Sequence, residues 1–160
     1  MRNSVLAALV AGLIVLVSGL ASAQHRGSGD HKGLPSVADA RVVVNVPPAM
    51  AAHTLANMRD HLLALQEITE ALAKGLHDKA ARIAEQRLGM SSLGSHGAHE
   101  IAKFMPKGMQ DAGSAMHRAA SRFAIEAQNV GVTGDVRPAL ATLGEVMSAC
   151  VGCHAGYRFK

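Results

Sequence analysis

Aromatic side chains are scarce in this chain of 160 residues: Phe, Trp and Tyr make up 2%, with no Trp at all. β-Sheets are enriched in aromatic and β-branched residues, so an extensive sheet is not expected. Hydrophobic residues still account for 49% of the chain, and without rings the core must be filled mainly by Ala, Leu, Val and Met. Because most of these residues favour helices, the composition predicts an all-α fold of one domain.

Clusters of basic residues are also missing. The formal net charge is +4, and Lys and Arg are spread along the chain. A nucleic-acid interface needs a basic patch, commonly with aromatic side chains that stack on bases. We therefore expect no nucleic acid among the partners.

The N-terminus has the pattern of a signal peptide. Arg2 precedes an apolar run over residues 5–17, and the small residues Ala21-Ser22-Ala23 follow. The run is too short for a comfortable membrane span, although an uncleaved N-terminal anchor is the alternative interpretation. We expect residues 1–23 to be removed and the mature chain to start at Gln24, periplasmic in a Gram-negative source and without stable membrane insertion.

Residues 24–49 lack helical periodicity and are interpreted as a flexible or extended leader. Val42-Val43-Val44 is expected to be a short extended segment that Pro47-Pro48 ends, with no sheet to join. The folded domain is expected to span residues 50–160.

Hydrophobic spacings of three and four predict four helices in this domain. They are expected from Met50 to Lys74-Gly75, from Asp78 to Gly89, from Pro106 to a turn at Asn129–Gly134, and from Asp135 into the C-terminal stretch. The expected core stripes are Leu55, Met58, Leu62, Leu65, Thr69, Leu72 and Leu76 in the first helix, Ala80, Ile83, Ala84 and Leu88 in the second, Met109, Ala112, Met116, Ala119, Phe123 and Ala127 in the third, and Val136, Leu140, Leu143, Met147, Cys150, His154 and Tyr157 in the fourth. Short connections favour an antiparallel four-helix bundle.

The chain has only two cysteines, and they stand three residues apart in Cys150-Val151-Gly152-Cys153-His154. A disulfide between them would close almost no loop and would constrain the chain little. Cys-x-x-Cys-His is the pattern of covalent c-type haem attachment. On a helix, the two thiols lie on one face and can add to the two vinyl groups of one porphyrin edge, and His154 can then serve as the axial iron ligand.

Two other uses of the cysteines fit less well. A structural zinc site needs four protein ligands, and there is no second Cys pair. A thioredoxin-like pair should follow a strand in a βαβ unit, and none is predicted. The motif therefore indicates one haem c per chain.

The C-terminal stretch Cys150-Val-Gly-Cys153-His154-Ala-Gly-Tyr157-Arg158 resembles class II c-type cytochromes, the cytochrome c′ and c-556 group, which carry the motif on the last helix. The resemblance covers about residues 50–160. It implies a periplasmic four-helix bundle that is often a homodimer, with periplasmic redox proteins as partners. It also implies that Arg158 lies beside His154 and tunes the electrostatics of the proximal side.

The resemblance leaves the distal side of the iron open. Met58, on the first-helix stripe, is the best candidate for a sulfur ligand by geometry, with core packing as its alternative role. Met50 is the second candidate. His53 and His61 flank the stripe and are candidate nitrogen ligands, although we expect both to be half-exposed surface residues.

Other histidines and methionines are expected to have no direct role. His96, His99 and Glu100 are interpreted as part of a solvated Gly-rich connection rather than a metal site. His117, beside Met116, is expected to face outward. Met105 and Met109 are expected to pack near Pro106, where either could reach the haem edge.

Three functions are considered for a haem protein with this motif: electron transfer, gas binding and peroxidase activity. A sixth ligand such as Met58 favours electron transfer, because the iron then keeps both axial ligands in both oxidation states. An open distal face would instead give a five-coordinate protein that binds NO or CO. A peroxidase would need a distal acid–base pair, and Arg59 and His61, the only candidates, point to different helix faces. We therefore predict that the protein transfers electrons and is not an enzyme.

Overall fold

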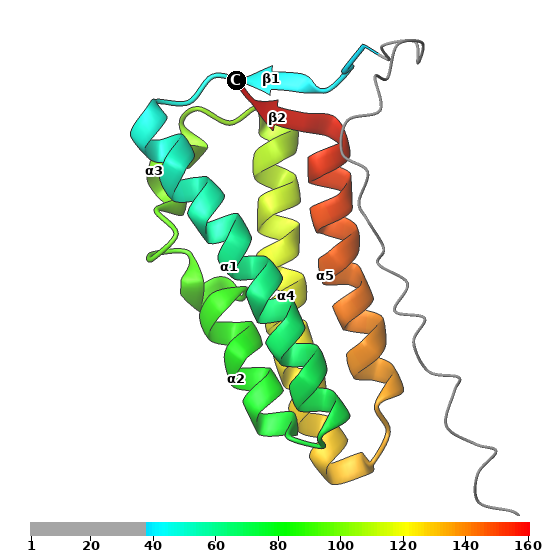
Figure 1. Cartoon of the computed structure of the whole chain (residues 1–160). Coiled ribbons are helices and arrows are strands. Elements are labelled where there is room, and N and C mark those ends of the chain that lie inside the picture. Colours follow the sequence, from blue (N-terminus) through cyan, green and yellow to red (C-terminus); the bar gives the residue numbers. More distant parts are fainter. Residues whose placement is uncertain (1–37) are drawn as a thin grey trace, which may run out of the picture. The chain divides into compact units, whose positions relative to one another are not determined.

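The computed structural model describes residues 38–160, so the predicted signal peptide at 1–23 and the leader up to residue 37 lie outside the described residues. The described part is mostly helical, which confirms the predicted all-α class (Figure 1). In chain order its elements are β1 (Val42–Val44), α1 (Pro48–Ala73), α2 (His77–Arg87), the 3₁₀ helix η1 (Met90–Ser92), α3 (Ala98–Ala102), α4 (Lys107–Thr133), α5 (Arg137–Gly156) and β2 (Tyr157–Phe159).

Glycines stand at the C-terminal ends of two long helices. Gly75 and Gly134 have φ angles of 68° and 71°, a left-handed conformation that ends α1 and α4. The end of α1 was predicted, but the turn expected at Asn129–Gly134 was wrong, because α4 continues to Thr133. Val130 is buried on α4, so packing keeps this segment helical against the turn preference of Asn and Gly.

The core is built mainly from alanine. α1 packs on α2, α2 on α4, and α4 on α5. Alanine lets helix backbones approach closely, and a few large side chains fill the space that remains. The largest fully buried hydrophobic side chains are Phe123, Ile68, Leu88 and Val146.

Two of the predicted core stripes were wrong by a rotation of the helix. In α1, Ala64, Ile68 and Ala71 are buried, whereas Leu62 is 69% exposed. In α5, Leu143 is buried as predicted, together with Ala139 and Val146, whereas Leu140 and Met147 are largely exposed. The prediction weighted large apolar residues, but these helices also bury alanines such as Ala64, Ala71 and Ala139.

Val42–Val44 does join a sheet. β1 pairs with β2 in parallel, with Val42 opposite Tyr157 and Val44 opposite Phe159. The two strands lie across the end of the helices where α1 begins and α5 ends (Figure 1). The expectation that Val42–Val44 has no partner was therefore wrong, because its partner is the segment directly after the Cys-x-x-Cys-His motif.

Candidate functional site

One cavity lies among the first half of α1, residues 93–105, the first half of α4 and the last turns of α5. The cavity volume is about 220 Å³, smaller than the roughly 300–1,000 Å³ of typical small-molecule and cofactor sites. Its walls combine apolar side chains with sulfur atoms and imidazoles. The α1 side consists of Thr54, Asn57, Met58 and His61, the α4 side includes Met109, Met116 and His117, and the α5 side consists of Ala149, Cys150, Cys153 and His154.

The three side chains of the motif face this cavity together. Cys150, Cys153 and His154 all line it from the C-terminal end of α5. Both cysteines are half-buried free thiols. Burial raises the pKa of each thiol, and the neighbouring Cys153 raises that of Cys150 further. Two free thiols and an imidazole on one wall of a largely apolar cavity form a donor set that fits a covalently attached haem.

The α1 wall separates the four candidates for a distal ligand. Met58 and His61 line the cavity, whereas Met50 and His53 do not. Met58 and His61 lie one turn apart on the same side of α1, and Thr54 precedes them on that side. Arg59 is exposed on another face of α1, as predicted. Met105 and Met109 also line the cavity.

Three histidines lie elsewhere than expected. His117 was predicted to face outward, but it is only 8% exposed, and its Nδ1 lies 2.7 Å from the Leu88 carbonyl oxygen. His96 was predicted to lie in a solvated connection and His61 to be a half-exposed surface residue; both are partly exposed, but both rings line the cavity. The ring centroids of His61 and His96 are 4.9 Å apart, and those of His96 and His117 are 5.5 Å apart.

The surroundings favour the neutral form of these imidazoles. Burial, followed by the nearby His96 and His117, lowers the pKa of His61 to about 4. Burial also lowers the pKa of His96 and of His117. The burial of His117 could have been predicted from the sequence. It follows Met116 on α4, and a buried helix face about 100° wide accommodates both residues. His99, by contrast, is exposed as expected.

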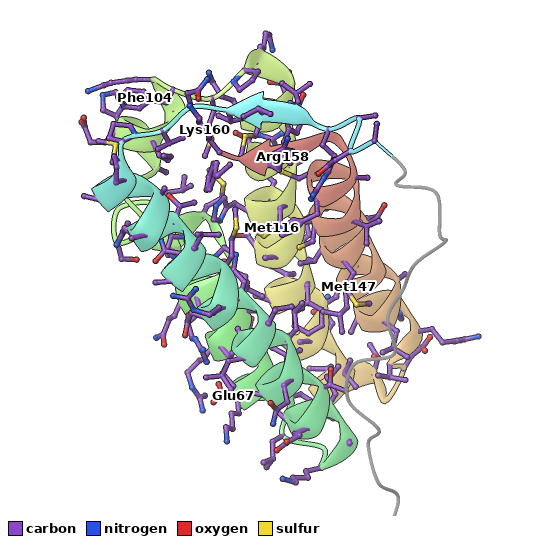
Figure 2. All side chains as sticks on the ribbon, turned by 45° about the horizontal axis from the view of Figure 1, so that its top comes forward. Glu67, Phe104, Met116, Met147, Arg158 and Lys160 are labelled. Carbon is purple, nitrogen blue, oxygen red and sulfur yellow. The ribbon has the colours of Figure 1, made fainter. Side chains whose placement is uncertain are left out.

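Charged residues from the segment before β1 and from β2 lie together beside the C-terminal end of α5. Arg158, labelled in Figure 2 on β2, has its Nε 3.1 Å from Asp39 Oδ2. Arg41 also pairs with Asp39, and its Nη1 lies 3.5 Å from the carbonyl oxygen of His154. The Arg41 guanidinium, which donates to Asp39, holds the pKa of that carboxyl well below its usual range. Arg158 thus lies near the motif in the chain and has Asp39 as its charge partner.

Comparisons with known proteins identified no relative of this chain. No family model, curated protein or solved structure matches this chain. None of the helices in residues 38–160 is long and apolar enough to cross a membrane.

Proposed function

We propose that this protein is a class II c-type cytochrome that carries electrons between periplasmic redox proteins. One haem would be bonded to the thiols of Cys150 and Cys153, with His154 as its axial iron ligand. The observation that carries the proposal is the common orientation of these three side chains, which line one cavity from one face of α5. The same proposal includes the signal peptide, the periplasmic location and an antiparallel bundle of α1, α2, α4 and α5.

The haem would supply a one-electron change at iron, and the chain's own residues would hold the group and shield it. The thioether bonds would fix its position, since this small Ala-rich core offers few large side chains to grip a cofactor. Met105, Met109 and Met116 would exclude water from the cavity with flexible side chains. Met58 is the proposed distal ligand, because it lines the cavity from the opposite helix, α1.

The test is the absorption spectrum of ferric and reduced protein produced in a host with haem-maturation machinery. The proposal predicts covalent haem and a low-spin spectrum with a sulfur-to-iron charge-transfer band. Met58→Ala should remove that band, and Met50→Ala, the matched control outside the cavity, should leave it unchanged. Absence of covalent haem after competent maturation would refute the proposal.

Two other spectra would revise the distal side. A low-spin spectrum that Met58→Ala leaves unchanged would point to His61, which lines the same cavity. A high-spin ferric spectrum, with immediate CO uptake by the reduced protein, would replace electron transfer by NO or CO binding.

A further inference from the structure

Three histidines from three segments of the chain meet in the same cavity. His61 comes from α1, His96 from the turn before α3, and His117 from α4. The three pairs of ring centroids are 4.9, 5.5 and 6.2 Å apart. With Met58 as the distal ligand, the proposed function uses none of these imidazoles, so their convergence needs its own explanation.

Hydrogen bonds fix which ring nitrogen of two histidines carries the proton. A carbonyl oxygen only accepts, so His117 Nδ1 must donate to Leu88 O, 2.7 Å away. The Ser92 hydroxyl donates its single proton to Gly89 O at 2.7 Å. It can therefore only accept from His96 Nδ1, which is 3.3 Å away. In both rings Nδ1 is protonated, and Nε2 presents a lone pair.

The third imidazole has an unsatisfied nitrogen. His61 Nε2 is buried and has no hydrogen-bond partner among the described residues. Buried polar atoms are almost always satisfied, so an exception calls for a partner such as a water molecule or an ion. His61 thus supplies a third ring nitrogen close to two rings whose Nε2 atoms carry a lone pair.

We propose that His61, His96 and His117 form a binding site for one late first-row divalent cation, of which Zn²⁺ and Cu²⁺ are representative. Imidazole suits these ions. Ligating histidines characteristically donate their other N–H to a backbone carbonyl or a similar acceptor, which is the arrangement of His117 and His96. The fourth position would face the cavity. This site goes beyond the proposed function and does not depend on it.

Ion binding requires one of the rings to turn. As the side chains stand, no three His, Cys, Asp or Glu residues within 38–160 form a group that could hold a metal ion. Three imidazoles on one tetrahedral ion, with metal–nitrogen distances of about 2 Å, would have ring centroids roughly 5 Å apart. The 6.2 Å between His61 and His117 is the spacing that must shorten. Rotation about the last torsion of His is soft, and His61 Nε2 has no hydrogen bond to lose, so His61 is the ring that turns while His117 and His96 keep their hydrogen bonds.

The test is calorimetric titration of the mature, haem-loaded protein with Zn²⁺, in which haem attachment has consumed the two thiols. We expect one zinc per chain. His96→Gln, a change in a turn, should weaken binding at least tenfold, since loss of an outer-shell partner alone costs about 10–100-fold. His99→Gln, which removes an exposed histidine three residues away, should leave the affinity unchanged. Zinc should also raise the melting temperature of the wild type and of His99→Gln, but not of His96→Gln.

Several outcomes would overturn the site: no stoichiometric zinc, binding unchanged by His96→Gln, or binding weakened equally by His99→Gln. Haem content, measured by absorption on the same samples, separates this proposal from the proposed function. A wild type that carries no haem after competent maturation would refute the cytochrome. The histidine site would still stand if zinc binding by that protein survived Cys150→Ser/Cys153→Ser and was lost with His96→Gln. Binding that requires the thiols would refute the histidine site.

Discussion

The two ends of the helices α1, α4 and α5 are built from different side chains. At the closed end, where α1 meets α2, the buried core includes Ala64, Ala71, Ala127 and Phe123. At the cavity end, the same helices present Met, His and Cys side chains. Alanine lets backbones approach closely, whereas the longer side chains keep them apart and leave space between them. One set of helices thus forms an alanine-rich packed core at one end and lines a cavity at the other.

Buried polar groups sharpen this contrast. The buried polar side chains of the described core are Thr54, Ser92 and His117, and all three belong to the cavity end. Each is within hydrogen-bond distance of a backbone carbonyl: Thr54 to Met50, Ser92 to Gly89, and His117 to Leu88. Burying polar groups is costly unless they are paired, so their concentration beside the cavity marks this end as specialised for function.

The largest expected effect is the loss of covalent haem at the cavity end without any change at the closed end. Cys150→Ser/Cys153→Ser should abolish covalent haem, because serine hydroxyls do not form the thioether bonds, while the closed end stays helical. Haem staining after denaturing electrophoresis and circular dichroism would measure the two outcomes. Met147→Ser, an exposed change on the same helix, should keep its haem. Haem that stays attached in the double variant would contradict the prediction.

The next prediction compares packing at the two ends in that haem-free double variant, so that haem contacts do not enter. Phe123→Ala should lower the free energy of unfolding by about 3–5 kcal/mol, because this fully buried ring would leave a cavity among small residues. Met105→Ala, which opens onto an existing cavity, should cost less than about 1.5 kcal/mol. Midpoints of urea unfolding would test this, and equal losses would contradict the contrast between the ends.

The same contrast explains what the sequence could predict. Periodicity and glycine placed the long helices, and the Cys-x-x-Cys-His motif identified three residues that line one cavity. The α1 stripe was wrong because α1 buries Ala64 and Ala71 and exposes Leu62. A hydrophobicity pattern does not show how closely two helices approach, and it therefore ranks leucine above alanine. The histidine cluster was missed because His61, His96 and His117 come together only through tertiary packing.

A third prediction concerns residues 88–97, the connection between α2 and α3. Gly89 has a φ of −76°, which any residue tolerates, but an added Cβ would lie 2.9 Å from the Glu85 Cα and would also meet the Glu85 carboxylate. Gly89→Ala should therefore destabilise the fold by about 1–3 kcal/mol through overpacking. Gly94→Ala, in the same connection, has open space around the added Cβ and should change stability by less than about 0.5 kcal/mol. Thermal unfolding of the pair would measure the difference, and similar melting temperatures would exclude the steric explanation.

The smallest expected effect is the acid sensitivity of this same connection, which Glu85 holds to α2. Burial tends to raise the pKa of Glu85, but hydrogen bonds from Ser121 and Ser91 outweigh it, and the net shift is downward from 4.5. A carboxyl whose pKa is lower in the folded state stabilises the fold above its unfolded pKa and loses this contribution as the pH falls through the folded value. Glu85→Gln should thus cost more at pH 7 than at about pH 3, by less than about 1 kcal/mol because the group is largely solvated. Urea unfolding at the two pH values would measure this, with Glu126→Gln on α4 as a charge-matched control, and a cost that does not change with pH would show that the charge of Glu85 does not stabilise the connection.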